Sequence, residues 1–269
     1  MHVGEDAEFY LSRGCRVVGV EANPGLMPLL QQKFCCELKT GRLHIINKAI
    51  AKEAGTAQLA VIEERLFHST MSPRFIERNR NLGFKMHFVE VQTIPLEEIL
   101  RKFGTPYYLK IDIEGMDMEC VEGLHRVAQR PRYVSFESSV HNAAANFEER
   151  FSELAHLWVL GYDHFKYVDQ ASLCNLENTL LQAEGPPLRY TYRKDSSGPF
   201  GEESPGEWCE IGAALTEMRG HIRTQNTVGL GNPYSQRVWS KVGRRVRRVA
   251  KHLPSHSWYD LHARLGSSS

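Results

Sequence analysis

The stretch from Tyr107 to Leu124 most constrains the fold, because it places charges inside a segment that otherwise has the pattern of a buried strand. A strand alternates its side chains, so we expect Lys110, Asp112 and Glu114 on one face. Buried charges are costly unless they pair or face water. Gly115 is expected to end the strand before a helix. Charges at the carboxyl end of a strand lie where α/β sheets bind ligands, so the stretch predicts an active site; a structural ion-pair network is the alternative.

Helical and strand spacings alternate along the chain as far as about position 170. Helices are expected over residues 5–13, 24–34, 95–103, 116–124 and 147–160. Strands are expected over residues 16–20, 43–50, 56–62, 87–93, 133–137 and 164–168, besides the one that starts at 107. Strands separated by helices of this length predict parallel crossover units, and therefore an α/β fold with a doubly wound, mostly parallel sheet.

Composition limits the class of protein. The 269 residues are 42% apolar, which suits one large α/β domain or one domain with extensions. No apolar run is long enough to span a membrane and no signal peptide opens the chain, so we expect a cytoplasmic protein. The six cysteines lack zinc spacing, and we expect buried thiols in a reducing compartment and no metal site.

The C-terminal region differs electrostatically from the rest of the chain. Residues 222–269 contain nine Lys or Arg and one acid, Asp260, so we expect a core domain over 1–215 and a basic extension over 216–269. Within it, residues 237–251 have helical spacing of valines among basic residues. Such a helix could contact an anionic membrane or nucleic acid, but we favour docking on the acidic body or simple solvation. Residues 184–207 have the composition of a long loop, either a lid or a connector.

Two strand ends offer candidate ligand contacts. Gly4 precedes the first helix, and Glu21 ends the strand that follows it. A carboxylate can accept two hydrogen bonds from a ribose diol, which makes this a nucleotide-type layout. A solvent-facing acid is the alternative. Asn47 and Ala49 close the following strand, where an adenine ring would lie in such a fold; a simple turn explains them equally well.

Other candidates concern proton transfer. His141 and His68 could each act as a general base, although a surface histidine is the simpler account of both. Tyr162 and Lys166 have the spacing of a dehydrogenase pair. That pair requires a helix, whereas these residues have the pattern of a strand, and the chain has no G-x-G-x-x-G; we therefore treat the match as coincidence.

Four segments together, VVGVEANP (17–24), INKAI (46–50), residues 91–100 and YLKIDIEG (108–115), resemble FkbM-type S-adenosylmethionine-dependent methyltransferases over about residues 3–170. The resemblance implies a Rossmann-like class I methyltransferase fold and methylation of a hydroxyl on a sugar or secondary metabolite. The acceptor would be a small molecule or glycan, with no nucleic acid partner and with possible peripheral membrane contact through the tail. The oligomeric state is left open.

The resemblance also implies roles for individual residues. On the cofactor side it places Gly4 in the glycine loop, Glu21 at the ribose with Asn23 beside it, and Asn47 and Ala49 at the adenosine.

On the acceptor side it places Asp112 near the methyl donor, with Lys110 and Glu114 shaping the site. Asp112 is the first candidate for the base that orients or deprotonates the hydroxyl, and His141 is the second.

Two features depart from the family pattern. The family's first strand and its Asp-x-Gly opening precede the helix near Glu5, so we expect that strand to be missing or truncated in the chain as given. Ala7 stands where the family commonly has threonine. A non-catalytic methyltransferase-fold protein that binds a partner or glycan is therefore the alternative function.

Overall fold

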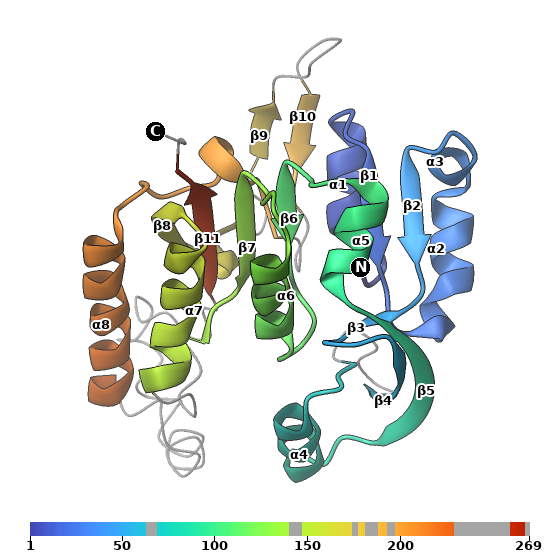
Figure 1. Cartoon of the computed structure of the whole chain (residues 1–269), viewed down its shortest axis with the longest axis horizontal. Helices are drawn as coiled ribbons and strands as arrows, with labels where there is room; N and C mark the ends of the chain where they lie inside the picture. The colour runs from blue at the N-terminus through green and yellow to red at the C-terminus, as the bar shows by residue number, and fades with distance from the viewer. Residues whose placement is uncertain are drawn as a thin grey trace, which may run out of the picture. The chain divides into compact units, whose positions relative to one another are not determined.

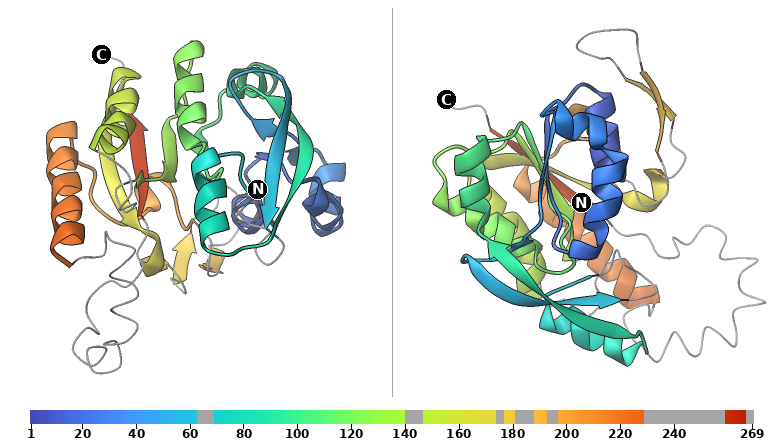
Figure 2. Two further views of the ribbon diagram at one scale, coloured as in Figure 1. Left: turned by 90° about the horizontal axis from the view of Figure 1, so that it is seen from below. Right: turned by 90° about the vertical axis from the view of Figure 1, so that its right-hand side faces the viewer.

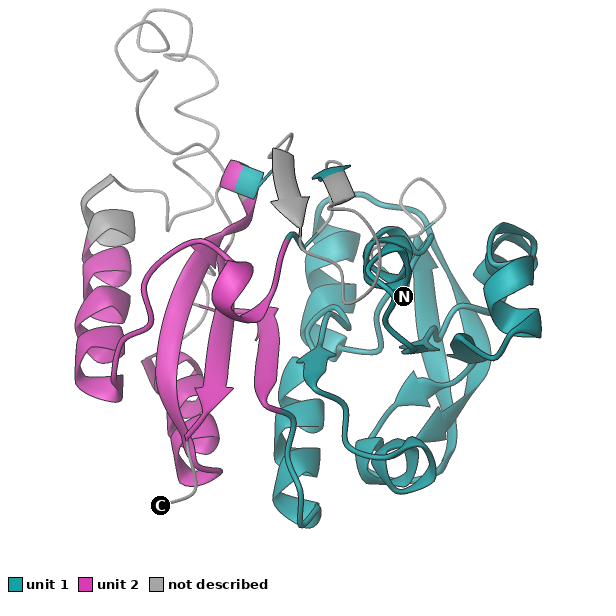
Figure 3. Cartoon of the chain, turned by 90° about the horizontal axis from the view of Figure 1, so that it is seen from above, with its two compact units in different colours: residues 1–131, 173–198 teal, residues 132–172, 199–269 magenta. Residues whose placement is uncertain are grey.

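The computed structural model describes residues 1–62, 69–139, 147–173, 177–180, 188–192, 197–228 and 259–266 (Figure 1). The chain forms two compact units, shown in different colours in Figure 3. Unit 1 comprises residues 1–131 and 173–198, and unit 2 comprises residues 132–172 and 199–269.

Unit 1 begins with alternating helices and strands. In chain order these are α1 (Glu5–Ser12), β1 (Val17–Val20), the short 3-10 helix η1 (Pro24–Leu26), α2 (Met27–Lys33), α3 (Cys35–Lys39) and β2 (Leu43–Ile46). β1 and β2 pair in parallel, with Val17 opposite Leu43 and Val20 opposite Ile46. The helices bury their apolar faces in a common cluster of Ala7, Leu11, Leu26, Leu30, Phe34 and Leu43. The alternation that the sequence predicts is confirmed here.

The middle of unit 1 is a three-stranded mixed sheet of β3 (Ala49–Ile50), β4 (Gly55–Ile62) and β5 (Met86–Ile94), in the order β3-β5-β4. β3 is parallel to β5, and β4 is antiparallel to it. β5 is a long curved ribbon in Figure 1, and Figure 2 shows β4 along its length as well; α4 (Pro73–Asn81) lies in the connection between the two strands. The three strands contribute a second buried apolar cluster, Ala49, Leu59, Val61 and Val91, which we call the sheet core.

Helix α5 (Leu96–Phe103) illustrates how local sequence sets an element. Pro95 precedes it, acids occupy its first turn and bases its last, which suits the helix dipole. Leu96, Ile99 and Leu100 are buried at helical spacing, and Gly104, with a φ of 85°, ends the helix.

The remaining elements of unit 1 are short: β6 (Tyr108–Lys110), α6 (Asp117–Gly123), η3 (Leu124–Arg126), and the antiparallel pair β9 (Glu177–Leu180) and β10 (Leu188–Thr191). The chain that follows β9 and β10 is fastened to α1. The ring of Phe9 lies 5.1 Å from that of Tyr192, and the Asp6 carboxylate accepts hydrogen bonds from the backbone and hydroxyl of Ser197.

Unit 2 contains β7 (Tyr133–Glu137), α7 (Phe147–Val159), β8 (Tyr162–Asp169), the 3-10 segments η5 (Gln170–Leu173) and η6 (Gly201–Glu203), α8 (Ile211–Val228) and β11 (Tyr259–Leu265). β11 lies between β7 and β8 and is antiparallel to both. Leu261 and Ala263, at the middle of β11, are fully buried. The C-terminal strand is therefore central to the sheet of unit 2.

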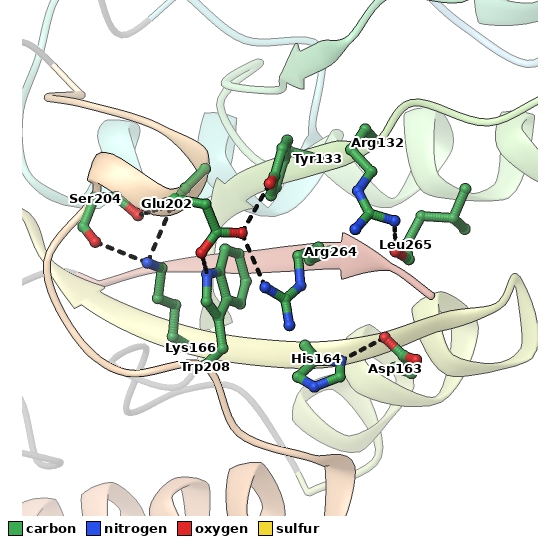
Figure 4. Close-up of polar contacts among 11 residues, drawn as sticks. Arg132, Tyr133, Asp163, His164, Lys166, Glu202, Ser204, Trp208, Arg264 and Leu265 are labelled. Atoms are coloured by element: carbon green, nitrogen blue, oxygen red, sulfur yellow. Dashed lines mark hydrogen bonds and ion pairs between the residues drawn. The ribbon is translucent and has the colours of Figure 1, made fainter. Parts of the chain in front are cut away.

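A polar network holds the loop around η6 to this sheet (Figure 4). The Glu202 carboxylate accepts from Tyr133 Oη at 2.8 Å, Trp208 Nε1 at 2.8 Å and Arg264 Nη1 at 2.9 Å. Lys166 Nζ donates to the carbonyl of Ser204 at 2.7 Å and lies 4.2 Å from the Trp208 ring centroid. Burial lowers the pKa of Lys166 to about 8. Glu202, Lys166 and Trp208 therefore belong to one packed polar network within unit 2.

The Lys166 network also answers the question of the Tyr-x-x-x-Lys spacing. Tyr162 and Lys166 lie on one strand, β8. Four steps along a strand separate them by about 13 Å, too far for the paired chemistry that a helix would allow. The strand therefore agrees with the interpretation that the Tyr-x-x-x-Lys spacing is a coincidence.

Several sequence expectations differ from the structure. Four of the six strand pairs with a described register are antiparallel, so the described sheets are mixed rather than mostly parallel. The predicted strand 43–50 divides into β2 and β3. α8 continues through the expected boundary at 215, and β11 joins a sheet instead of a separate extension. Residues 237–251 lie outside the described residues.

The cysteine prediction was wrong in part. Five described cysteines are free thiols, and Cys120 is buried, but Cys35 and Cys36 are exposed on α3 with their sulfur atoms 3.9 Å apart. Among the residues that the structure describes, none of the helices combines the length and the apolar character of a membrane span.

If β11 is integral to unit 2, Leu261→Ala should lower the free energy of unfolding by about 2–5 kcal/mol, because it leaves a cavity at a fully buried position. Chemical denaturation of the full chain measures this. Leu82→Ala is the matched control, since Leu82 is 63% exposed, and should change stability by about 0.5 kcal/mol or less. Equal effects of the two substitutions would contradict the placement of β11.

Candidate functional site

The carboxylate of Glu21 lies directly after β1 and is almost fully buried, with 9% of the residue exposed. Its Oε1 accepts from the backbone N–H of Asn23 at 2.8 Å, and its Oε2 accepts from the backbone N–H of His2 at 2.7 Å. The Asn23 side chain in turn accepts from Gly25 N at 2.9 Å and caps η1. Glu21 is therefore held by backbone donors on both sides, which fixes its orientation.

Asn47 follows β2 and lies against the same residue. Its Nδ2 donates to the backbone carbonyl of Glu21 at 2.8 Å. The contact arises because β1 and β2 are parallel, so that their carboxyl ends meet at one edge. Three of the predicted cofactor residues, Glu21, Asn23 and Asn47, are thus joined by direct hydrogen bonds.

Gly4 has two structural reasons to be glycine. Its φ is 83°, in the left-handed region, and a Cβ at this position would lie 2.4 Å from Cε2 of Phe34. Next to Phe34, Lys33 Nζ donates to the carbonyl of Val3 at 3.1 Å. The loop before α1 is therefore shaped by the end of α2, and a ligand contact at Gly4 stays a prediction.

Ala49 is placed differently from what we expected. It belongs to β3, only 2% of it is exposed, and its methyl group is part of the sheet core. Any contact of this residue with an adenosine would therefore have to come from its backbone.

The segment of Lys110, Asp112 and Glu114 is a loop over most of its length, which we call the motif loop (residues 111–116). β6 ends at Lys110, and Glu114 and Gly115 have φ values of 51° and 88°. The expectation that the three charges share one strand face was wrong, because the backbone turns after Lys110. Lys110 Nζ and Asp112 Oδ2 are 3.8 Å apart, and the Asp112 side chain is 53% exposed.

Asp117 holds the motif loop in shape, a role that the sequence reasoning missed. Its Oδ1 accepts from Ile113 N at 3.1 Å and its Oδ2 from Gly115 N at 3.3 Å. Burial, followed by the charge of Asp112, raises the pKa of Asp117 from an ordinary 3.8 to about 6; the Ile113 N–H bond and Lys110 oppose this. An Asp two residues after a loop glycine and opening a helix is a recognisable signal for such a turn.

The segment after β4 also supports the motif loop, through a hydrogen bond and ring packing. Thr70 Oγ1 donates to the carbonyl of Glu114 at 2.7 Å, and the Ser72 backbone N–H donates to Thr70 Oγ1 at 2.9 Å. Further along, a Cβ on Gly115 would lie 2.9 Å from Cε1 of Phe75, so this α4 ring packs on the loop. Glu114, which has an uncommon positive φ for a residue with a side chain, is thus supported from outside the loop.

The sheet core connects the two groups of candidate residues. Ala22, the residue after Glu21, packs against it, and so does Met71, the residue after Thr70. The cofactor candidates and the supports of the motif loop therefore rest on one apolar cluster within unit 1.

Two candidates remain unplaced, since His68 and His141 lie outside the described residues. In the parts of the chain that the structure describes, no group of three or more His, Cys, Asp or Glu side chains is arranged to hold a metal ion. The groups available for chemistry are carboxylates, an ammonium and backbone donors. Such groups can bind hydroxyls and accept a proton.

Replacing Gly4 with alanine tests the packing of the glycine loop. Gly14→Ala is a matched control, because Gly14 has a φ of 84° but no neighbour within 4 Å of the added Cβ. We expect Gly14→Ala to cost about 1–2 kcal/mol from backbone strain, and Gly4→Ala about 1–3 kcal/mol more from the contact with Phe34. Urea denaturation compares them, and equal losses would rule out the role of Phe34.

Asp117 should make stability depend on pH. Because the folded pKa is above the unfolded one, the folded protein binds the proton more tightly, and stability falls as pH rises from about 4 to about 6. The fall should reach at most about 3 kcal/mol, less to the extent that water screens the side chain. Asp117→Asn should remove it, and exposed Glu90→Gln should not. Parallel stability profiles for wild type and Asp117→Asn between about pH 4 and 7 would contradict the assignment.

Comparison with known proteins bears on these residues. A family model described as the methyltransferase FkbM domain matches residues 1–163, more than half of the 269 residues, and this span contains Glu21, Asn47 and the motif loop. Comparisons with curated proteins and with solved structures find no match. The chain therefore belongs to the FkbM methyltransferase family.

Proposed function

We propose that this chain is an S-adenosylmethionine-dependent O-methyltransferase that acts on a hydroxyl of a sugar or secondary metabolite. Family membership supports methyl transfer. The observation that carries the proposal furthest is the direct contact of Glu21 with Asn47 at the carboxyl ends of two parallel strands. That edge is where nucleotide-type ligands bind in α/β sheets, and a Rossmann-like class I arrangement is part of the proposal.

The cofactor-side residues suit an adenosine group. A carboxylate has about four lone-pair positions. In Glu21, Oε2 faces the His2 N–H and the Met1 amino group at 3.2 Å, whereas Oε1 accepts only the Asn23 N–H among the described contacts and keeps capacity for a ribose hydroxyl. Asn47, held by its bond to the Glu21 carbonyl, would flank the base. The cofactor supplies a methyl group on a sulfonium that is already activated for displacement.

The glycine loop completes the cofactor side of the proposal. Gly4 lies at the start of α1 with a left-handed backbone and no side chain. It would contribute backbone close to the ligand, where a side chain would keep the ligand away.

On the acceptor side we assign Asp112 as the residue that orients the hydroxyl and accepts its proton. Its side chain is more than half exposed and therefore accessible, and the Lys110 ammonium lies 3.8 Å from its Oδ2. Glu114 shapes the acceptor site through its backbone, whose carbonyl accepts a hydrogen bond from Thr70 Oγ1 and so helps to fix the motif loop. With an activated donor, the main contribution of the protein is alignment of the acceptor oxygen, and the rigid loop provides this. His141 is the second candidate for the base.

The proposal includes a cytoplasmic location, which the thiols support. Five described cysteines are free, including the exposed Cys35 and Cys36 with sulfur atoms 3.9 Å apart. Exposed free thiols are typical of a reducing environment, which supports a cytoplasmic location.

Glu21→Gln and Asp112→Asn should separate the two sides of the site. We expect Glu21→Gln to weaken S-adenosylmethionine binding about tenfold or more, since a charged acceptor for the ribose is lost. Asp112→Asn should keep that affinity and lower turnover about 10²–10⁴-fold. Calorimetry measures binding, and transfer of a labelled methyl group to a panel of hydroxylated compounds measures turnover.

Exposed Glu90→Gln serves as the control and should behave as wild type. Loss of cofactor binding in Asp112→Asn would move Asp112 to the cofactor side, and full activity in that variant would remove it from the site. If the full chain does not bind S-adenosylmethionine, the methyltransferase proposal fails in favour of a non-catalytic binding protein.

A further inference from the structure

Arg78, on α4, is an exposed residue whose guanidinium group makes two contacts with neighbours on the same helix. The central carbon of its guanidinium group lies 4.1 Å from the ring centroid of Phe75, and its Nε donates to Oδ1 of Asn79 at 3.4 Å. Asn79 is itself buried, with 2% of the residue exposed. Stacking on an aromatic face and a bond at Nε leave the planar group little freedom to rotate.

The two terminal nitrogens of Arg78 have no partner among the residues that the structure describes, and no described carboxylate forms an ion pair with this side chain. These nitrogens carry the parallel N–H groups that match two oxygens of a carboxylate, phosphate or sulfate. An arginine whose Nε and guanidinium face make contacts, and whose two terminal nitrogens are accessible, is preorganised to bind an anion.

Arg78 lies beside the motif loop. The Phe75 ring on which it stacks also packs on Gly115, within about 3 Å of where a Cβ would be. The same segment is bonded to the loop through Thr70 and Glu114. Around this loop the neighbouring side chains Asp112 and Glu114 are acidic, so an anionic ligand needs a cation such as Arg78 to offset their repulsion.

We propose that Arg78 determines acceptor specificity by binding an anionic group, a carboxylate, phosphate or sulfate, on the molecule that is methylated. The role in acceptor binding rests on the methyltransferase function proposed above, whereas the anion site itself does not. The substrate class would then be acidic or phosphorylated hydroxy compounds, with the anionic group at Arg78 and the hydroxyl at Asp112.

The test is a titration of the full chain with inorganic phosphate, followed by NMR of the backbone amides of Phe75 and Gly115. We expect saturable shifts of both signals in the wild type, and a dissociation constant about ten to a hundred times weaker in Arg78→Gln, the usual loss when a charged hydrogen-bond donor is removed. Parallel titrations with sulfate and acetate show whether the site prefers a tetrahedral anion or a carboxylate.

Arg80→Gln is the matched control. Arg80 is exposed on the same helix two residues later, about 200° around the axis, and makes no described side-chain contact with Phe75. It should bind phosphate as the wild type does. Absence of saturable shifts in the wild type, or equal weakening in the two variants, would overturn the anion site, since the latter is the behaviour of diffuse surface charge. Thermal unfolding of both variants confirms that they fold.

Calorimetry with S-adenosylmethionine separates this inference from the function on which it partly rests. Arg78→Gln should bind the cofactor as the wild type does, because Arg78 lies on the acceptor side. A chain that binds phosphate through Arg78 but does not bind the cofactor would keep the anion site and overturn the methyltransferase proposal. A chain that binds the cofactor but not phosphate would overturn the anion site and keep the methyltransferase proposal.

Discussion

The parallel pairing of β1 with β2 is the constraint on which the proposed cofactor side of the site depends. It brings the ends of the two strands to one edge, where the Asn47 side chain reaches the Glu21 backbone. The Glu21 carboxylate is then fixed by backbone donors from residues 2 and 23. The contact between Asn47 and Glu21 would not survive a shift in register, because a one-residue slip reverses the faces of every side chain in the strand.

The proposed acceptor side depends on a different kind of interaction. The motif loop is held by the Asp117 carboxylate at the start of α6. It is also held by Thr70 and Phe75, which lie in the segment after β4. A loop held in this way can present Asp112 to solvent while its backbone stays fixed. The sheet core supports both sides, since Ala22 and Met71 pack against it from the two segments. The arrangement of one site thus follows from one apolar cluster.

Sequence periodicity predicted most helices and strands of unit 1, because their apolar spacings are regular and their ends carry glycine, proline or charged residues. It failed after Lys110, where the alternation of charges continues although the strand does not. The turn is set by the hydrogen bonds of Asp117 and by the positive φ values of Glu114 and Gly115, which the alternation of charges does not indicate. β11 was missed for another reason. Its alternation of polar and apolar residues is clear over 260–265, but it lies after a basic segment that dominated the interpretation.

The contact between Gly4 and Phe34 has a consequence for how sequences of this kind can vary. The two positions are far apart along the chain, yet the ring occupies the space that any side chain at position 4 would need. A larger residue at position 4 becomes possible only together with a smaller one at position 34, and even then the left-handed backbone at position 4 favours glycine. Anyone redesigning the loop before α1 would therefore have to treat positions 4 and 34 as a single unit of substitution.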